Sequence, residues 1–182
     1  METLYYSKLE SPVGALYVGV SEKGMVLLDL HGGEFLRKPS LNGHRGAKVQ
    51  WVESEKKTAA YVAELKEYFA GRRKKFSLPL DLRETEFQKR CWQALLKIPY
   101  GKTCSYADIA RQVGSPRSFR AVGQANHNNP VAIIVPCHRV VTSDGKLGGY
   151  GGGLAMKEKL LRLEGAMQEL APSLFPSARS GD

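Results

Sequence analysis

The sequence predicts an α+β protein in which a small α/β unit precedes a mostly helical unit. Two patterns predict this fold class: short apolar runs separated by turn residues fill the first 30 positions, and amphipathic helical spacing dominates after residue 81. We therefore expect one domain over residues 1–80 and a second over 81–170. The remaining residues, 171–182, contain several Pro and Ser and are expected to form a disordered tail.

The composition indicates a folded protein with a polyanionic partner. Hydrophobic residues make up 42% of the 182 positions, which is enough for a core, and the formal net charge is +9. Such a charge favours nucleic acid as a partner, although a plain basic surface is the alternative. No run approaches the ~18 apolar residues of a membrane span, and the first residues do not resemble a signal peptide. We therefore expect a cytoplasmic protein without membrane contact.

Three cysteines, Cys91, Cys104 and Cys137, form no C-x-x-C pair. An odd number without paired spacing argues against a disulfide framework and against a zinc knuckle, and it favours a reducing compartment. The other histidines show no metal-ligand spacing either, so we expect no metal.

The first unit is expected to begin with three strands, at residues 4–9, 15–20 and 25–30, because turn sequences at 11–14 and 21–24 separate them. Residues 32–48 resemble a loop. A helix is predicted over residues 55–70, where Val62, Leu65 and Phe69 share one face and Gly71 follows as a stop signal. The basic run at 71–75 is typical of a solvated turn.

The second unit contains the pattern of a helix-turn-helix. A capping box at Thr85–Gln88 predicts one helix, Ser105 is expected to cap a second that ends near Val113, and Ser115-Pro116 is expected to open a third. Two short helices joined by a glycine-containing turn form the DNA-binding motif, but such pairs also occur without that role. Residues 102–139 carry a net charge of +4, which favours phosphate contacts.

The most reactive pattern lies at Cys137 and His138. A buried strand over residues 131–135 is expected to lead through Pro136 to this pair, whose position Pro136 would restrict. A nearby imidazole or helix terminus raises the thiolate fraction of a cysteine, although most Cys-His dipeptides are purely structural. Contact between the two side chains would need a turn or a bridging water, because neighbours on a strand point to opposite faces.

Two later segments could complete a site. Residues 143–146 have the composition of a hairpin turn, and the glycine-rich residues 148–153 around Tyr150 could be a simple connector or a wall that admits a flat ligand. The last helix, predicted over 154–164, places Lys157, Leu161 and Glu164 on one face, with Gly165 at its end. Glu164 could be a surface residue or the third member of a Cys-His-acid relay.

Five blocks of sequence resemble one family in its own order: IPYGKTCSYADIA, RAVGQAN, NPVAIIVPCHRVV, SDGKLGGYGGGL and KEKLLRLEG. The run from Pro136 to Val140 closely resembles the acceptor signature of the 6-O-alkylguanine-DNA alkyltransferases, the methylated-DNA–protein-cysteine methyltransferases. The resemblance covers residues 87–165. It implies a ribonuclease H-like first domain, which residues 1–80 match only in size and β content, and a winged helix-turn-helix second domain that carries the active site.

The resemblance also implies a role for each matching residue. Cys137 would accept the alkyl group, His138 would take the thiol proton, Glu164 would hold the imidazole, Asn129 would organise the adjoining turn and Tyr106 would assist the departing guanine. Arg120 resembles the residue that fills the space left by an extruded nucleotide. The remaining matches are Ser105, Ala121, Gln124 and Ala125 for DNA contact, and Val140, Tyr150, Gly151 and Lys157 for the substrate pocket.

The activity implied is direct-reversal DNA repair without a cofactor. The protein would flip 6-O-alkylguanine out of duplex DNA, at a cost of a few kcal/mol, and move the alkyl group irreversibly to Cys137, once per molecule. 4-O-alkylthymine stays open as a second substrate. We expect a monomer in solution, associated with the nucleoid if the source is prokaryotic.

Three alternatives remain at this point: a lesion-binding relative without alkyl transfer, a winged-helix transcription factor and a cysteine hydrolase. A cysteine at position 137 argues against the first of these. The absence of an amino-terminal cysteine-histidine cluster and of an extra metal-binding domain argues against a structural zinc and against an inducible regulator. Cys104 is expected to be structural, with secondary alkylation as its alternative.

Overall fold

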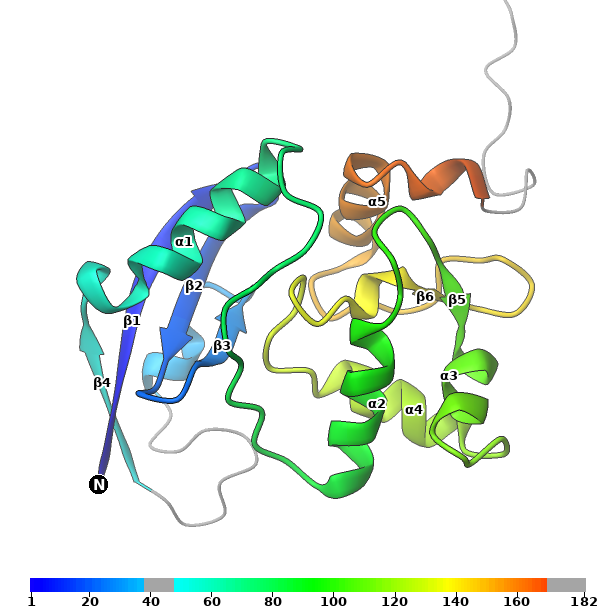
Figure 1. The fold of residues 1–182 in the computed structure, drawn as a ribbon, viewed down its shortest axis with the longest axis horizontal. Coiled ribbons are helices and arrows are strands. Elements are labelled where there is room, and N and C mark those ends of the chain that lie inside the picture. The colour runs from blue at the N-terminus through cyan, green and yellow to red at the C-terminus, as the bar shows by residue number, and fades with distance from the viewer. Residues whose placement is uncertain (38–47, 170–182) are drawn as a thin grey trace, which may run out of the picture.

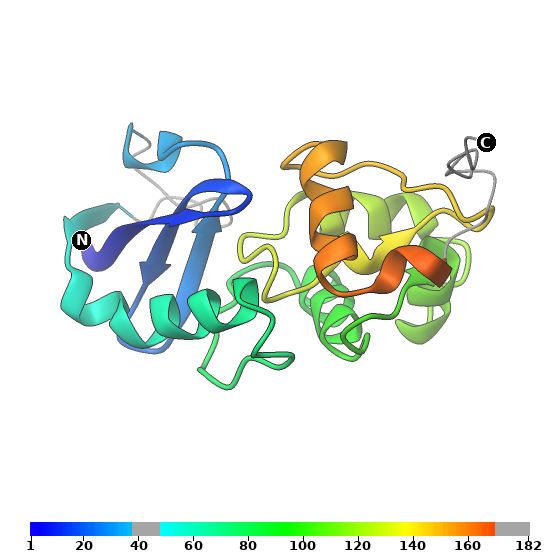
Figure 2. The same ribbon diagram turned by 90° about the horizontal axis from the view of Figure 1, so that it is seen from above.

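The computed structural model describes residues 1–37 and 48–169, so most of the loop predicted at 32–48 and the tail predicted at 171–182 lie outside the described residues. Two bodies lie side by side, a sheet with its helix at one end and a cluster of short helices at the other (Figures 1 and 2). In the described part of the chain, no helix has the length and apolar character needed to cross a membrane.

The first body is a four-stranded sheet in the order β3-β2-β1-β4. Its strands are β1 (Glu2–Ser11), β2 (Gly14–Val20), β3 (Met25–Asp29) and β4 (Val49–Glu53), of which only β4 runs parallel to its neighbour. The three predicted strands are confirmed. The fourth was not predicted, because the short run VQWVE gains its strand partners only from β1.

Each face of this sheet is covered. Helix α1 (Glu55–Phe69) lies across one face, as predicted, and Ser7 of β1 shares a buried 2.6 Å hydrogen bond with Thr58 of α1 (Figure 1). The other face carries a group of aromatic rings, including Phe35 of the 3₁₀ helix η1 (Glu34–Arg37) and Trp51 at a centroid distance of 4.7 Å. Gly19 makes room for this group, because a Cβ there would lie 2.9 Å from the Trp51 ring.

The second body contains α2 (Glu86–Leu96), α3 (Tyr106–Gln112), α4 (Phe119–His127) and α5 (Leu154–Leu163). Two-residue strands β5 (Cys104–Ser105) and β6 (Val140–Val141) pair in parallel, and the 3₁₀ helices η2 (Cys137–Arg139) and η3 (Ala166–Glu169) complete it. The Thr85 capping box, the Ser105 cap and the end of α5 before Gly165 are confirmed.

The prediction that Ser115-Pro116 opens the third helix is wrong. Helix α4 begins at Phe119, and the Ser118 N–H donates instead to the Ser115 carbonyl at 2.8 Å. This is a β-turn with Pro116 in its second position, a position that proline favours in turns just as it favours the first position of a helix. Ser115-Pro116 is therefore compatible with either a helix start or a β-turn, and the chain forms the β-turn.

The predicted strand at 131–135 is also wrong. Val131 forms a bridge to Leu28 of β3, and the chain then folds back so that Ala132 pairs with Val135. Ile133, at the tip, has φ = 73°, the only positive φ of a non-glycine residue in the described segments. A β-branched residue in that region is strained, a feature often found beside functional sites.

Backbone hydrogen bonds of strand β3 join the two bodies. The Leu28 N–H donates to the Pro130 carbonyl at 2.8 Å, and Met25 exchanges backbone hydrogen bonds with Pro79 and Asp81 of the connecting segment. The edge strand β3 therefore packs directly against the turn that precedes Cys137.

Candidate active site

The candidate acceptor cysteine, Cys137, lies at the start of a short turn rather than at the end of a strand. Cys137 begins η2 directly after Pro136, whose φ is −84°. Because the 3₁₀ turn replaces extended backbone, Cys137 and His138 are not forced onto opposite faces as they would be along a strand. Cys137 is 7% exposed and lines a cavity of about 320 Å³.

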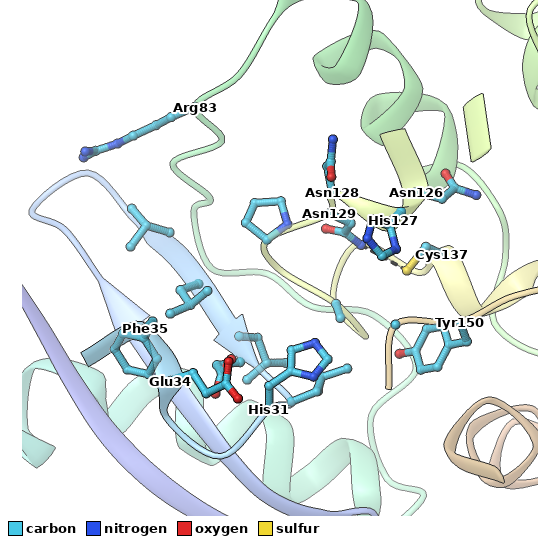
Figure 3. A pocket seen from close by; sticks show the side chains of 18 of the residues that line it. His31, Glu34, Phe35, Arg83, Asn126, His127, Asn128, Asn129, Cys137 and Tyr150 are labelled. Atoms are coloured by element: carbon cyan, nitrogen blue, oxygen red, sulfur yellow. Dashed lines mark hydrogen bonds between the residues drawn. The ribbon is translucent and has the colours of Figure 1, made fainter. Parts of the chain in front are cut away.

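Asn129 fixes the position of the sulfur. Its Nδ2 donates to Cys137 Sγ at 3.2 Å (Figure 3). The same Nδ2 donates to the Val135 carbonyl at 2.8 Å, and Oδ1 accepts from the Val131 N–H at 3.0 Å. One amide side chain thus holds both ends of the strained turn and the sulfur that follows it.

A buried carboxylate holds the imidazole. His138 Nε2 lies 2.8 Å from Glu164 Oε1, and both side chains are fully buried. Arg139 donates to the same carboxylate from Nε, at 2.8 Å, and from Nη2, at 2.9 Å. The other ring nitrogen of His138, Nδ1, is buried and has no hydrogen-bond partner among the described residues. With Nε2 directed at the carboxylate, Nδ1 is the atom free to accept a proton.

Burial and charge set the protonation states of this group. Burial alone would raise the pKa of Glu164, but hydrogen bonds from His138 and Arg139, together with the positive charge of Arg139, lower it to about 2. Burial lowers the pKa of His138 despite the Glu164 carboxylate, so the resting imidazole is neutral. Burial also raises the pKa of Cys137, against the opposing effects of Asn129 and Lys157. The resting sulfur therefore keeps its proton.

Two tyrosines lie near the sulfur. Tyr106 begins α3 with its hydroxyl 3.2 Å from where a Cβ of Gly148 would stand, and Gly148 has φ = 72°, which favours glycine. Tyr150 lines the cavity with its hydroxyl buried and without a partner among the described residues. Burial raises the pKa of both phenols, and a thiolate at Cys137 would raise it further. Both are therefore hydroxyl donors at neutral pH.

The cavity lies between the two bodies. Leu28, His31 and Glu34 line it on the sheet side, and Asn129, Cys137, Tyr150 and Gly151 line it on the helical side (Figure 3). Its volume is within the range of small-ligand sites.

Val140 and Lys157, which were expected at the pocket, are fully buried and do not line this cavity. Lys157 Nζ donates to the carbonyls of Val140, Leu147 and Gly149, and therefore anchors the loop that carries Tyr150. Burial lowers the pKa of Lys157 to about 8. Its action on the pocket is indirect.

The surface of the helix-turn-helix presents some of the expected DNA contacts and not others. Arg120, Ala121 and Gln124 are exposed on α4, and Ser105 is half-buried because its hydroxyl caps α3. Ala125 is different: it is 1% exposed, and its carbonyl accepts a 2.9 Å hydrogen bond from the Trp92 indole. Ala125 lies three residues after the buried Val122, on the core face of α4, so its assignment to a DNA contact is corrected.

Three residues at these sites were missed from the sequence. Phe119 is 53% exposed directly before Arg120, Arg139 pairs with Glu164, and the Tyr68 hydroxyl donates to Glu164 Oε1 at 2.7 Å. Phe119 could have been noticed as an apolar residue beside basic ones. The other two contacts have no local signal, because they join residues far apart in the chain.

No group of three His, Cys, Asp or Glu side chains within residues 1–37 and 48–169 is arranged to hold a metal ion.

Comparison with known proteins covers both bodies. A family model described as 6-O-methylguanine DNA methyltransferase, ribonuclease-like domain, matches residues 4–82, and one described as the DNA binding domain of the same enzyme matches residues 86–166. A methylated-DNA–protein-cysteine methyltransferase of Methanosarcina barkeri is 45% identical over 162 residues, which span 88% of this chain and 97% of the relative. Its counterpart from Mycolicibacterium paratuberculosis is 45% identical over 170 residues, spanning 93% and 98%.

Solved structures agree. Mycobacterium tuberculosis OGT in complex with DNA is similar with a TM-score of 0.76 and 42% identity, over 89% of this chain and 93% of that one. The R37L variant of the same organism's O6-methylguanine methyltransferase is similar with a TM-score of 0.77, over 95% and 99%. The chain belongs to the 6-O-methylguanine DNA methyltransferase family, the DNA repair transferases that move an alkyl group from the guanine of DNA to a cysteine of their own chain.

Proposed function

We propose that Cys137 is the alkyl acceptor and that His138, Glu164, Asn129 and Tyr106 serve it in the roles that the resemblance implies. The observation that carries this proposal is the position of the Cys137 sulfur. It lies in the wall of the 320 Å³ cavity, held by Asn129 at 3.2 Å and followed by a buried imidazole whose Nδ1 has no hydrogen-bond partner among the described residues. Neither a transcription factor nor a hydrolase is needed to explain these residues.

The reaction begins from neutral groups. The Cys137 thiol gives its proton to His138, directly or through one water, and Glu164 stabilises the imidazolium that forms. The sulfur then bonds to the alkyl carbon while the bond from that carbon to guanine O6 breaks. The electron pair of that bond passes to the base, which takes up a proton, while the His138 imidazolium releases the proton that it took from the thiol; the net result is that the thiol proton ends on guanine. The products are a thioether on Cys137 and unmodified guanine, so atoms and charge balance.

The high pKa of the buried thiol fits this order of events. A resting thiolate would be costly without solvent, whereas a thiolate formed next to a new imidazolium is compensated. The Tyr106 hydroxyl stays protonated and supports departure of the base by sharing its developing negative charge. Because none of the described residues near the sulfur is suited to breaking a thioether, each molecule should react once.

The DNA interface follows from the exposed side of α4. Arg120 would fill the space of the flipped nucleotide, and Ala121 and Gln124 would lie against the groove beside Ser105. Phe119 adds an exposed aromatic ring directly before Arg120, the type of apolar side chain that minor-groove proteins insert between bases. With a net charge of +9, affinity for duplex DNA should fall steeply with salt. We propose that the protein acts as a monomer and, if the source is prokaryotic, on the DNA of the nucleoid. 4-O-alkylthymine is a second substrate to be assayed.

The test is an intact-mass measurement after incubation with duplex DNA that carries 6-O-methylguanine. The wild-type protein should gain one methyl group, mapped to Cys137, and Cys137→Ser should gain none while still binding the duplex. Cys104→Ser is the matched control: Cys104 is half-buried and its pKa is raised to about 11 by burial, so its loss should leave the mass gain unchanged. Methylation at Cys104, or continued product release by unmodified protein, would refute the assignment.

A further inference from the structure

The N-terminal body contributes one side chain to the group around His138. Tyr68, in the last turn of α1, donates its hydroxyl to Glu164 Oε1 at 2.7 Å. His138 Nε2 lies 2.8 Å from the same oxygen. A residue from the first body and the imidazole of the second therefore share one carboxylate oxygen.

Tyr68 is held firmly in this position. It is fully buried, and its ring packs against Phe69, Phe76 and Tyr100 at centroid distances of 5.3, 5.4 and 6.2 Å. Burial, together with the charge of Glu164, raises its pKa far above the ordinary value for a phenol. The hydroxyl is thus a permanent donor, and the carboxylate oxygen is its only hydrogen-bond acceptor recorded among the described residues.

Several charged groups surround the imidazole besides Glu164. Arg139 and Lys157 lower the pKa of His138, and the Arg139 guanidinium lies 5.8 Å from the centre of the Tyr100 ring. Tyr68 differs from these groups because it acts through the carboxylate. A hydrogen bond to a carboxylate oxygen draws negative charge away from any other donor on that oxygen. Tyr68 therefore weakens the attraction of Glu164 for the His138 N–H.

We propose that Tyr68 is a positioning residue for alkyl transfer, through which the N-terminal body holds the Glu164 carboxylate and limits how strongly it attracts the His138 N–H. The inference rests on the proposed role of His138 as proton acceptor. It gives the first body a part in the chemistry of the second: the hydroxyl keeps the imidazole neutral, and so able to accept the thiol proton, down to a lower pH.

The test is the pH dependence of single-turnover transfer from free 6-O-benzylguanine, which needs no DNA binding, in the full chain. Without the Tyr68 hydroxyl, more negative charge remains on Glu164 Oε1, the oxygen that faces His138. Because this charge stabilises the imidazolium, the pKa of His138 rises. In Tyr68→Phe, the midpoint of the profile of transfer rate against pH should therefore move to higher pH, by about half a pH unit to one unit. On that acidic limb the rate should be roughly three- to tenfold lower, with a smaller change on the alkaline plateau.

Two matched variants control for the loss of a tyrosine hydroxyl. The Tyr61 hydroxyl, on the same helix, donates to the Pro79 carbonyl, and the Tyr100 hydroxyl, beside the Tyr68 ring, donates to the Leu163 carbonyl. Neither touches the carboxylate, so Tyr61→Phe and Tyr100→Phe should keep the wild-type pH profile. A Tyr68→Phe profile that superimposes on the wild type, or equal shifts in all three variants, would overturn the inference.

A second substitution covers the case in which Tyr68→Phe does not fold. Replacement of Tyr68 alone by 3-fluorotyrosine keeps the hydroxyl and makes it a more acidic, stronger donor. The pH profile should then move in the opposite direction, toward lower pH, and an unchanged profile would contradict the proposal. Failure of the wild-type protein to react at all would refute the proposed function instead, so the two failures are distinguishable.

Discussion

The N-terminal sheet and the segment around Cys137 are built on different principles. Strands β1 and β2 pair residue by residue from Tyr5–Val20 to Ser11–Gly14, so most of their backbone hydrogen bonds come from one regular ladder. The segment from Asn129 to Arg139 has no such ladder: it turns on itself at Ile133 and takes its order from the Asn129 amide, the Glu164 carboxylate and the edge of β3.

The contrast shows that backbone pairing orders the sheet, whereas side chains from distant parts of the chain order the segment around Cys137. A regular sheet satisfies its own polar groups and tolerates change at one position. A reactive segment needs one sulfur and one imidazole at fixed places, and this requires side chains that reach from elsewhere in the chain. Helix α1 belongs to both regions, because Thr58 near its start bonds to the sheet and Tyr68 near its end bonds to the Glu164 carboxylate.

The largest expected effect is at the carboxylate. Glu164→Gln removes the charge that stabilises the imidazolium, so transfer from methylated duplex should slow by about 100-fold or more. Arg139 is left buried without its counter-ion, which should lower the free energy of unfolding by about 3–5 kcal/mol. Single-turnover rates and urea unfolding measure both effects.

Glu158→Gln is the control for that change. Glu158 lies on the same helix, α5, and pairs with Arg162 on the surface, where such pairs contribute under about 1 kcal/mol. Its rate and stability should match the wild type. An equal loss in the two variants would show that the relay assignment is wrong.

The pH dependence of stability sharpens the same comparison. The pKa of Glu164 is about 2 in the folded protein, below its ordinary value of 4.5, so its stabilising effect is complete above pH 4.5 and is lost as the pH falls toward 2. Over that range the wild type should lose about 3 kcal/mol more unfolding free energy than Glu164→Gln. Parallel curves for the two proteins in acid denaturant titrations would contradict the carboxylate assignment.

A smaller effect is expected on the DNA side. Arg120→Ala should slow repair of methylated duplex by roughly tenfold, because extrusion of the nucleotide loses its support, and should leave transfer from free 6-O-benzylguanine unchanged. Arg72→Ala removes the same charge from the exposed surface of the other body and should affect neither rate. Equal slowing of both substrates by Arg120→Ala would rule out the flipping role.

The smallest effect on transfer is expected inside the sheet. Ser7→Ala removes the 2.6 Å hydrogen bond to Thr58 and should lower the unfolding free energy by about 1 kcal/mol. The rate per folded molecule should stay at the wild-type value, since Thr58 holds only the start of α1. A slowed transfer would mean that the whole of α1, rather than Tyr68, governs the site.

Much of this structure could be predicted from short-range pattern. The first three strands, α1, the Thr85 capping box and the end of α5 at Gly165 each depend on residues within a few positions of one another. Cys137 and Glu164 were candidates because of their residue types and the resemblance. The errors lie where one local sequence has two solutions, as at Ser115-Pro116, or where a continuous apolar run hides a reversal of the chain, as at Ile133.

The first three strands, α1, the basic charge and the candidate pair Cys137–His138 could be read from the sequence alone, because propensity, capping and composition act over a few residues. The tertiary structure decided the rest: that the thiol is buried and protonated, that Ala125 faces the core, that Lys157 anchors a loop, and that Tyr68 reaches Glu164 from 96 positions away. Desolvation and long-range hydrogen bonds depend on which surfaces meet, and no local pattern contains that information.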